Sequence, residues 1–409
     1  MTMLKIAHVV RRFTFDEWGG TESVVWNTAL QQCAMGLEPE ILATCALAMP
    51  GEELRQDIHI RRFPYWYPYF PMTAETRLAL DKKGGNPFSP KLFQELQKGG
   101  YSLIHIHCGG RLAVQCALTA KRLGIPSVIS LHGGHAKVPQ EEIQKMLAPT
   151  KGKFHYGGIM DRLMGLRKDA VAEASAVICL SHAEQSALQE RLPNQRIVYL
   201  PNGVDCQVFQ TKPTISPRTE WGIPQERRLL LCISRIDYQK NQAILLEALA
   251  KLPDTHLLLV GPITSQTYYE QLLQKAHGLN VTNRLTIIPG LPPDDPRLKA
   301  ILHEAELFVL PSIHEPFGIV ALEAWAAGLP VVAARVGGLP DFIVHERNGL
   351  LFNPQDAADL TAQITRLLGD IELRNTLVAN ALTDVLNYSW SAITQRLAEL
   401  YHELLHAPK

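Results

Sequence analysis

Two glutamates flank an expected helix start in the segment Ser312-Ile-His-Glu-Pro-Phe-Gly-Ile-Val-Ala-Leu-Glu-Ala324. Glu315 lies in the loop before the helix, and Glu323 follows about two turns later. Carboxylates accept hydrogen bonds from sugar and ribose hydroxyls, and free amides at a helix start bind anions. The segment therefore predicts a site for a polyhydroxylated ligand that carries a phosphate. For two isolated glutamates, capping by Glu315 and a solvated position for Glu323 are the commoner alternative.

A pair of basic residues could complete such a site. Arg235 and Lys240 follow the expected strand 229–233, in a loop that leads into a helix. Two fixed cations at that place can hold a diphosphate, although two basic residues in a loop are more often solvated. Gly19 and Gly20 follow the first expected strand in the same way, where their amides could approach a phosphate or form a plain turn.

His132 ends another apolar strand and is followed by two glycines. A histidine there is usually a structural hydrogen-bonding residue, but at the carboxyl end of a parallel strand it is also well placed to touch a substrate. The chain has no Gly-x-Gly-x-x-Gly fingerprint, no Walker-type phosphate loop, no Asp-x-Asp motif and no His/Cys cluster in the sequence. We therefore expect no cofactor and no metal.

Short β-branched runs separated by helical segments must position these residues. The runs fall at residues 6–10, 103–107, 127–131, 176–180 and 197–200, and they restart at 229–233, 256–260, 285–288, 307–310, 331–334 and 350–352. Continuous apolar strands that alternate with helices indicate parallel sheets covered on both faces. The predicted fold class is α/β, with two doubly wound parallel-sheet domains in tandem.

The stretch 201–224 contains four prolines and has no sustained period, so we interpret it as a linker over the surface. The tail 390–405 alternates apolar and polar residues at helical spacing and should dock as an amphipathic helix. We therefore expect domains at 1–205 and 206–388, followed by a terminal helix within 389–409.

Composition excludes several function classes. The 409 residues carry 40 basic and 40 acidic side chains, and a formal net charge of zero argues against a nucleic-acid partner. A hydrophobic content of 46% argues against disorder, and seven cysteines, an odd count, indicate reduced thiols. Neither a signal peptide nor a run of about 18 apolar residues is recognisable, so a cytoplasmic location is expected.

In combination, these motifs resemble the retaining glycosyltransferases of family 4. The segment from Glu315 to Glu323 is similar to the double-Glu motif of that family. Further elements resemble it in their order along the chain, namely the Gly19-Gly20 loop, Pro201 to Asp205, the Arg235 and Lys240 loop, Gly337-Gly338-Leu-Pro340, Asn348 to Phe352 and Tyr388-Ser-Trp390. The resemblance spans nearly the whole chain and is strongest from Pro201 onward.

The resemblance implies a GT-B fold, with two Rossmann-like domains facing a cleft and the terminal helix crossing back to the first. It implies that the acceptor lies mainly on the first domain and the donor on the second. The implied catalytic set is Glu315, His132, Arg235 and Lys240. The residues implied to bind the donor are Gly19, Gly20, Arg235, Lys240, Gly290, Leu291, Glu315, Phe317, Gly318, Ile319 and Glu323.

The implied activity is metal-independent transfer of a hexosyl unit from a UDP- or GDP-linked sugar to a hydroxyl acceptor. A growing glycan, a lipid-linked sugar and a small metabolite are all expected acceptor classes, and no dedicated nucleophile is expected. A nucleotide-sugar epimerase on the same fold and a non-catalytic sugar-nucleotide-binding protein remain alternatives. Two positions depart from the family pattern: Gly133 stands where many relatives have Asp, and Asn241 stands where Gly is frequent.

Two stretches of the first domain predict the acceptor side. Residues 61–71 hold five aromatic side chains after Phe63, and residues 145–168 hold six basic side chains against the single Asp161. Aromatic faces stack on sugars, and a basic, apolar segment suits an anionic membrane surface, so peripheral contact with the inner face of the membrane is one expectation. A packed loop and a solvated helix face remain equal alternatives. The candidate acceptor residues are Thr21, Tyr65, Trp66, His132, Lys151 and Lys153.

Overall fold

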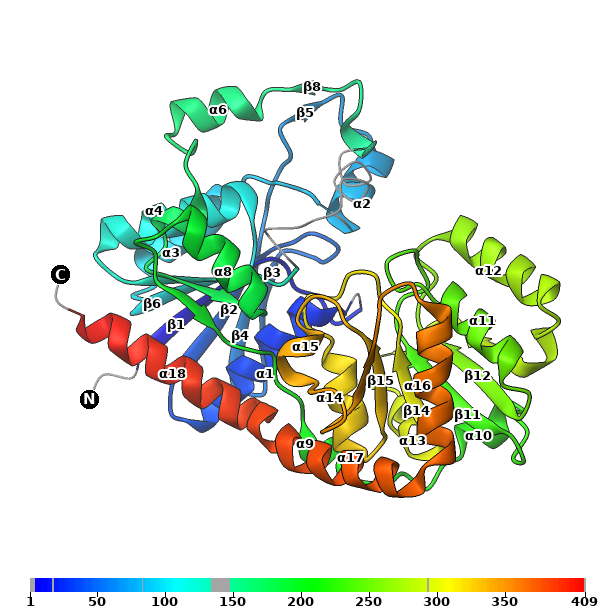
Figure 1. Cartoon of the computed structure of the whole chain (residues 1–409). Helices are drawn as coiled ribbons and strands as arrows, with labels where there is room; N and C mark the ends of the chain where they lie inside the picture. Colours follow the sequence, from blue (N-terminus) through cyan, green and yellow to red (C-terminus); the bar gives the residue numbers. More distant parts are fainter. Residues whose placement is uncertain (1–3, 17, 83, 134–147, 293, 408–409) are drawn as a thin grey trace. The chain divides into compact units, whose positions relative to one another are not determined.

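The computed structural model describes residues 4–16, 18–82, 84–133, 148–292 and 294–407, which form two compact units. The first unit comprises Met1–Pro201 together with Ile393–Lys409, and the second comprises Asn202–Ala392. Figure 1 shows the parallel sheets and the helices that cover them. The division after Pro201 lies four residues before the expected boundary at residue 205.

The first unit contains an eight-stranded sheet in the order β10-β9-β7-β6-β1-β2-β4-β3. Its strands are β1 Lys5–Arg12, β2 Glu38–Thr44, β3 Gly51–Arg55, β4 Ile58–Phe63, β6 Leu103–Ile106, β7 Ser127–Ser130, β9 Ala176–Cys179 and β10 Ile197–Tyr199. All neighbours are parallel except β3 and β4. The five strands expected from the sequence are present, and β2, β3 and β4 are additional.

Helices cover both faces of this sheet. The described helices of the unit are α1 Gly20–Ala34, α2 Ala74–Lys82, α3 Pro90–Lys98, α4 Gly110–Leu123, α6 Gly157–Leu163, α7 Ala170–Glu173, α8 His182–Arg191 and α18 Trp390–His406, of which α2 and α6 lie beside β5 and β8 instead of on the sheet. Ile104 and Ile106 of β6 pack against α4, whereas Leu103 of the same strand faces Leu397 and Tyr401 of α18. This alternation follows from the two-residue period of a strand. The tail is therefore a helix, as its spacing predicts, and it packs on the first unit.

The second unit contains a six-stranded, fully parallel sheet in the order β13-β12-β11-β14-β15-β16. The strands are β11 Arg228–Ile233, β12 Thr255–Val260, β13 Leu285–Ile288, β14 Leu307–Leu310, β15 Val331–Ala334 and β16 Leu350–Phe352. The helices are α9 Cys206–Gln210, α10 Pro217–Glu220, α11 Ala243–Lys251, α12 Gln266–Gly278, α13 Pro296–Glu304, α14 Ile319–Ala326, α15 Leu339–Phe342, α16 Ala357–Gly369 and α17 Ile371–Asp384.

The stretch 201–224 is not the plain surface linker that its prolines suggest. It contains α9 and α10, and Val204 and Ile223 are buried. The side chain of Asp205 accepts a hydrogen bond from the amide of Val208 and caps α9, while Pro217 occupies the first turn of α10. The interpretation was wrong because prolines favour a first helical turn as readily as they break a helix.

None of the described helices is long and apolar enough to cross a lipid bilayer. The seven cysteines all lie within the described residues, and they form no disulfide there.

Candidate functional site

The order of the second sheet brings two loops together. The chain moves outward in one direction from β11 through β12 to β13, and then returns to place β14 on the other side of β11. In a parallel sheet, the loops that follow these two central strands diverge and leave a crevice at their carboxyl ends. The loop after β11 carries Arg235 and Lys240, and the loop after β14 carries Glu315. The topology therefore juxtaposes three of the residues that the sequence singled out.

Lys240 and Glu315 form an ion pair at the centre of this arrangement. The Lys240 ammonium donates a 2.6 Å hydrogen bond to Glu315 Oε2, and Ser312 Oγ donates to the same oxygen over 3.0 Å. The side chains of Lys240 and Glu315 are 15% and 8% exposed. A charge held this far from water needs its partner, so the two groups are mutually fixed.

Asp237 organises the loop that presents the two cations. Its carboxylate forms a 2.9 Å ion pair with Arg235 and accepts hydrogen bonds from the amides of Gln239 and Lys240 and from the hydroxyl of Thr264. Asn241, next in the chain, has a left-handed backbone with φ of 51°. Asn is one of the few non-glycine residues that adopt this conformation readily, which explains how it stands where Gly is frequent in the resembled family.

A glycine turn presses against the backbone of Glu315. The amide of Gly338 donates a 3.1 Å hydrogen bond to the carbonyl of Glu315. At Gly337, which has φ of 55°, a Cβ atom would lie 1.8 Å from that carbonyl oxygen. Only glycine allows so close an approach, so the Gly337-Gly338 turn fixes the position of the backbone at Glu315.

Helix α14 begins directly after this loop. Gly318 is its N-cap, with φ of 92°, and Ile319 is its first residue, slightly later than the sequence suggested. The first amides of a helix have no partner within it, so this helix start offers donors to an anion. The side chain of Phe317 packs on Phe342 in the core, which leaves only its backbone for a ligand.

Glu323 lies in the second turn of α14 and is half-buried. Burial raises the pKa of its carboxyl from 4.5 to about 7. Among the described residues its side chain makes no hydrogen bond and no ion pair, whereas Lys240 is paired with Glu315. A carboxyl that is both costly to ionise and unpaired is a ready acceptor for ligand hydroxyls.

Gly290 and Leu291 follow β13. Gly290 has φ of 95°, and its amide donates a hydrogen bond to the carbonyl of Ile288, which closes a turn there.

In the first unit, the same topological change occurs between β1 and β6. Gly19 caps α1, and Gly20 and Thr21 form its first residues. Thr21 lines a cavity of about 520 Å³, and the remaining lining residues are Val10, Arg11, Arg12, Glu22, Gly84, Gly85, Asn86, His107, Cys108, Gly109 and Gly110. Burial raises the pKa of Glu22, whose carboxylate lies 3.4 Å from Arg12.

His132 follows β7 and lines a second cavity of about 410 Å³ together with His107 and Lys168. The two rings are joined by a 2.9 Å hydrogen bond between His132 Nε2 and His107 Nδ1. Burial lowers the pKa of His132 from 6.5 to about 4, so this histidine is neutral near pH 7. Thr21 and His132 therefore lie on separate cavities that share the residues His107 to Gly110.

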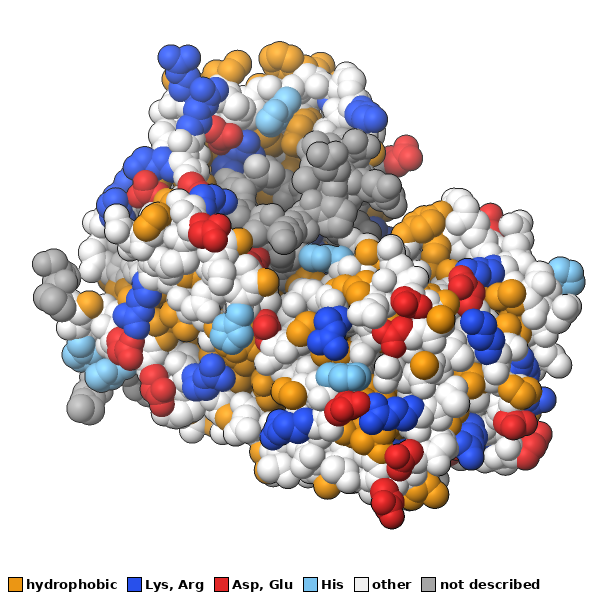
Figure 2. Space-filling view, in the orientation of Figure 1, with side chains coloured by type: hydrophobic (Ala, Val, Ile, Leu, Met, Phe, Trp, Pro, Cys, Tyr) orange, Lys and Arg blue, Asp and Glu red, His pale blue; other side chains and the backbone are white. Residues whose placement is uncertain are grey.

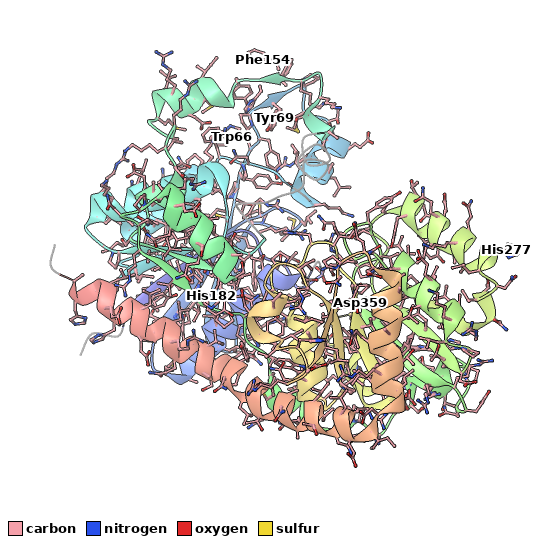
Figure 3. The ribbon with its side chains drawn as sticks, viewed as in Figure 1. Trp66, Tyr69, Phe154, His182, His277 and Asp359 are labelled. Carbon is pink, nitrogen blue, oxygen red and sulfur yellow. The ribbon has the colours of Figure 1, made fainter. Side chains whose placement is uncertain are left out.

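The aromatic and basic candidates of the first unit divide into buried and exposed residues. Tyr65 is buried, and its hydroxyl donates a 2.6 Å hydrogen bond to Asp81, so the structure gives this ring a packing role rather than the open stacking face expected. Trp66, which Figure 3 labels, is 39% exposed, and its ring stacks on that of Phe88. Lys151 is exposed, and Lys153 donates to the carbonyl of Pro71. Residues 134–147, which include Lys145, lie outside the described residues.

Exposed apolar side chains gather near these lysines. Two short strands, β5 Tyr69–Phe70 and β8 Phe154–His155, pair with each other and lie beside α6 (Figure 1). Phe154 is 65% and Leu163 81% exposed, and Figure 2 shows hydrophobic and basic atoms together over this part of the unit. We call the side chains of Phe70, Lys151, Phe154, Ile159, Arg162 and Leu163 the β5–β8 surface.

Sequence reasoning missed two groups of residues. Asp237 and Ser312 position Lys240 and Glu315, and the short spacing Asp-x-x-Lys was the available signal, because an aspartate often accepts from amides two or three residues later. His8, His105 and His107 line up on one sheet face, and the alternation His-Ile-His on an apolar strand was the signal there.

Two family models match the chain. Residues 18–208 match the model described as Glycosyltransferase Family 4, and residues 216–384 match the model described as Glycosyl transferases group 1. The chain is 31% identical over 325 residues to a D-inositol 3-phosphate glycosyltransferase of Thermobispora bispora, covering 76% of this chain and 72% of that protein. It is 30% identical to a protein of the same name from Salinispora arenicola, and the match covers 95% of this chain and 88% of that protein.

Solved structures of similar fold extend over the whole chain. Sucrose-phosphate synthase of Thermosynechococcus elongatus matches with a TM-score of 0.74 and 23% identity, covering 99% of this chain and all of that one. Anabaena HepE, in complex with UDP and glucose, matches with a TM-score of 0.72 and 23% identity, covering 98% and 100%. At these identities the likeness shows the fold, which is GT-B.

Proposed function

Since the chain belongs to glycosyltransferase family 4, and is a glycosyltransferase, we propose that it moves a hexosyl unit from a nucleoside-diphosphate sugar to a hydroxyl acceptor with retention of the anomeric configuration. The observation that carries this proposal is the Lys240–Glu315 ion pair at the β11/β14 switch point, directly before the start of α14. One cation, one carboxylate and a row of free amides occupy the place where parallel sheets bind their ligands.

The proposed step breaks the bond between the anomeric carbon and the diphosphate oxygen. Positive charge then develops on the sugar and negative charge on the leaving phosphate. Lys240, Arg235 and the amides at the start of α14 stabilise the phosphate, so the proposal requires no metal. The acceptor hydroxyl attacks from the face that the phosphate leaves, and its proton passes to a phosphate oxygen. Glu315 orients the sugar through its hydroxyls and forms no bond to carbon.

We propose UDP as the first donor nucleotide to test and GDP as the second. Support for UDP comes from HepE, which is similar in fold over its whole length and is seen with UDP. Glu323 would accept from the ribose hydroxyls, and the turn at Gly290 and Leu291 would meet the base. Within the first unit, Gly19 and Gly20 lie at the amide-rich start of α1 and remain candidate phosphate-binding residues.

For the acceptor, we propose a polyhydroxylated molecule that carries a phosphate. Two observations support this class. Arg11 and Arg12 line the larger cavity of the first unit, and Lys168 lines the other. The relatives named D-inositol 3-phosphate glycosyltransferase make a phosphorylated cyclitol the first acceptor to screen. Phosphorylated sugars and lipid-linked sugars come next, because they present the same phosphate to a basic cavity.

The test of donor binding is thermal stability against a panel of UDP, GDP, ADP, dTDP and their common sugars. A ligand at about 100 times its dissociation constant adds roughly 2.7 kcal/mol to the free energy of unfolding. We expect a rise in Tm with one base, loss of that rise in Lys240→Ala, and its retention in Lys251→Ala, which removes an exposed lysine of the same unit. A wild-type protein whose Tm responds to no nucleotide contradicts the proposal.

Transfer itself is followed with the nucleotide identified in that way. Proton NMR of the product should give the anomeric configuration of the donor, and an inverted product would contradict the retaining mechanism. Release of an epimerised free sugar nucleotide without any acceptor would instead establish the epimerase alternative. Binding without either reaction, after a full acceptor screen, would leave the non-catalytic alternative.

We also propose that the β5–β8 surface contacts an anionic membrane, where a lipid-linked acceptor would be presented. Phe154 and Leu163 could enter the interface, while Lys151 and Arg162 meet anionic headgroups. Sedimentation with vesicles containing phosphatidylserine should remove the protein from the supernatant. The variant Phe154→Ser with Leu163→Ser should stay in solution, whereas Leu273→Ser, on α12, should sediment normally. Equal behaviour of all three proteins would contradict membrane contact.

A further inference from the structure

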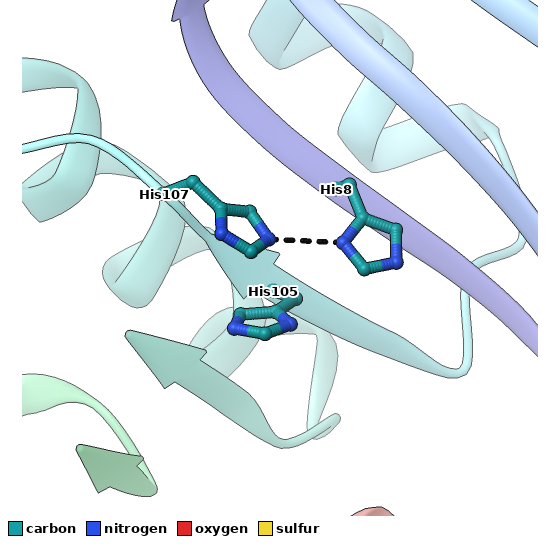
Figure 4. A group of neighbouring side chains, drawn as sticks. All are labelled: His8, His105 and His107. Atoms are coloured by element: carbon teal, nitrogen blue, oxygen red, sulfur yellow. Dashed lines mark hydrogen bonds between the residues drawn. The ribbon is translucent and has the colours of Figure 1, made fainter. Parts of the chain in front are cut away.

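Three histidines of the first unit are joined end to end. His8 Nδ1 and His107 Nε2 are 2.9 Å apart, and His107 Nδ1 and His132 Nε2 are also 2.9 Å apart. The other ring nitrogen of His8, Nε2, lies 2.7 Å from the side-chain amide oxygen of Gln32 on α1. Figure 4 shows the His8–His107 bond, with His105 beside it. The result is an unbroken series of hydrogen bonds from a buried side chain of α1 to the edge of a cavity.

Strand geometry explains this alignment. His8 lies on β1, His107 directly follows β6 and His132 follows β7, and these three strands are neighbours in the sheet. The amide of His107 donates to the carbonyl of Val9, which holds the end of β6 in register with β1. Side chains of alternate residues point to one face, so His8 and His107 meet there and are both buried.

The histidines of this hydrogen-bonded series are neutral. Burial lowers the pKa of His8 to about 4 and that of His107 well below its ordinary value, and His132 behaves in the same way. A neutral imidazole has one N–H donor and one acceptor nitrogen. The direction of one hydrogen bond in the series therefore determines the direction of the next. The oxygen of Gln32 only accepts. It therefore requires the proton of His8 on Nε2, which leaves Nδ1 of His8 to accept from His107.

We propose that Gln32, His8 and His107 are positioning residues that hold His132 in one tautomer, with its proton on Nε2 and its Nδ1 left as an acceptor at the cavity. The role of that acceptor rests on the proposed function, because Nδ1 would receive a hydrogen bond from a substrate hydroxyl. The 410 Å³ cavity lined by His132 is the place where such a hydroxyl would lie. A histidine free to exchange tautomers would offer this acceptor only part of the time.

A metal site is the competing interpretation of these residues. One ligand atom each from His8, His105 and His107 lies within 4.8 Å of the others. However, both ring nitrogens of all three are already hydrogen-bonded, since His105 contacts Tyr401 and Ser130 through its two nitrogens. The hydrogen-bonded chain accounts for every one of these nitrogens without an ion, and we therefore favour it.

The first experiment uses the unaltered protein. Nitrogen-15 NMR of the histidine rings, with elemental analysis of the purified protein, reads the tautomers directly. We expect a single neutral tautomer for His8, His107 and His132, each with its proton on Nε2. A mixture of tautomers at His132, a proton on its Nδ1, or one equivalent of bound zinc or copper whose removal alters these signals would overturn the proposal.

The second experiment breaks the series of hydrogen bonds at Gln32, the member farthest from the cavity. Gln32→Met keeps the size of the side chain but removes the acceptor, and Gln31→Met is the matched control on the same helix. We expect Gln32→Met to give a mixed tautomer at His132 and to lower kcat about 2- to 12-fold, the equivalent of one neutral hydrogen bond, with the donor KM changed less. Circular dichroism and Tm must show that both variants are folded.

The outcomes separate this proposal from the proposed function. If the wild type binds and transfers no sugar nucleotide, the proposed function fails while the NMR result still decides the tautomer of His132. If the wild type is active and Gln32→Met matches Gln31→Met in both NMR and kcat, the positioning role is overturned. A loss of Tm without a change of tautomer would likewise assign Gln32 to stability alone.

Discussion

Both units have a topological switch point beside their first strand, but the residues near it present different kinds of chemistry. In the second unit, the loops at the β11/β14 switch point hold full charges of both signs, with Lys240 bonded to Glu315 and Arg235 to Asp237. In the first unit, His8 in the middle of β1 and the histidines that follow β6 and β7 form a chain of neutral rings. Strand order therefore decides where a site can form, and the residues in the loops decide what it can bind.

This difference predicts opposite weaknesses. A buried ion pair is damaged when one partner is removed, because the other charge is left without compensation. A chain of buried neutral histidines is damaged by protons, because each added charge must be held away from water. Substitution should therefore be the sharper probe of the second unit, and acid the sharper probe of the first.

The largest effect is expected from Lys240→Met. This change leaves the Glu315 carboxylate buried and unpaired, which should lower the free energy of unfolding by about 3–5 kcal/mol. Loss of a cation that stabilises the leaving phosphate should also lower kcat/KM about 10²- to 10³-fold. Urea unfolding and a transfer assay measure the two effects.

A double substitution separates charge burial from catalysis. Lys240→Met with Glu315→Gln removes both charges and should recover most of the lost stability while activity stays low. If the double variant remains as unstable as Lys240→Met, the pair is not the mutually compensating unit that its geometry indicates, and the contrast between the two units weakens.

The next largest effect is expected from Gly337→Ala. Its Cβ would lie 1.8 Å from the carbonyl oxygen of Glu315, so the loop must move in addition to the cost of a left-handed alanine. We expect about 3–4 kcal/mol of destabilisation together with weaker nucleotide binding. Gly328→Ala is the matched control, since Gly328 also has a positive φ, of 73°, but its Cβ would meet open space. That variant should lose only about 1–2 kcal/mol. Equal losses would show that the close approach to Glu315 carries no specific strain.

The sequence predicted the second unit better than the first. The strands Leu285–Ile288, Leu307–Leu310, Val331–Ala334 and Leu350–Phe352 have the predicted bounds, because the strands of a parallel sheet covered on both faces are short, continuous apolar runs. Strand β3, Gly51–Arg55, was missed because it is a charged, exposed edge strand paired antiparallel to β4, and it buries no apolar face of its own.

The candidate site shows the same asymmetry. Arg235, Lys240 and Glu315 could be placed at strand ends from their spacing alone, and the sheet order brings them together. The bond between His107 and His132 depends on which strands are neighbours, which spacing does not encode. Tyr65 and Trp66 are adjacent in an aromatic run, and only packing decides that the first is buried and the second exposed. Local signals thus locate loop residues, while long-range order selects their partners.

Acid should destabilise the first unit through its histidines. The pKa values of His8 and His132 fall from 6.5 to about 4 on folding, and those of His105 and His107 fall as well. Between these pH values the folded unit binds fewer protons than the unfolded chain. The contribution of these histidines to the free energy of unfolding is therefore greatest above pH 6.5 and declines as the pH falls towards 4.

The share of one histidine can be measured. His132→Asn should reduce the loss of stability between pH 7 and pH 4.5 by on the order of 2–3 kcal/mol, whereas His277→Asn, on the exposed face of α12 (Figure 3), should leave it unchanged. Urea unfolding at several pH values gives the slopes. Parallel slopes for all three proteins would mean that His132 takes up its proton as readily in the folded state as in the unfolded one.

The smallest effect, and the one with the opposite sign, belongs to Glu323 of the second unit. Its pKa rises from 4.5 to about 7 on folding, so the folded state retains a proton that the unfolded chain loses. The stability that this proton contributes is fully present below pH 4.5 and is lost as the pH rises through 7. Because the side chain is only partly buried, we expect on the order of 1–2 kcal/mol, and Glu323→Gln should remove this part of the pH dependence.

Ligand binding provides the stricter test of Glu323. A carboxylate that accepts from ribose hydroxyls must be ionised, so affinity for a nucleotide sugar should rise between pH 6 and pH 8 in the wild type and stay flat in Glu323→Gln. A nucleotide sugar is the right probe, since its diphosphate is esterified at both ends and does not titrate in this range. Calorimetry should also detect proton release on binding below pH 7 in the wild type alone. If both proteins have the same pH profile, ribose recognition belongs to another group, and the charged chemistry of the second unit ends at the Lys240–Glu315 pair.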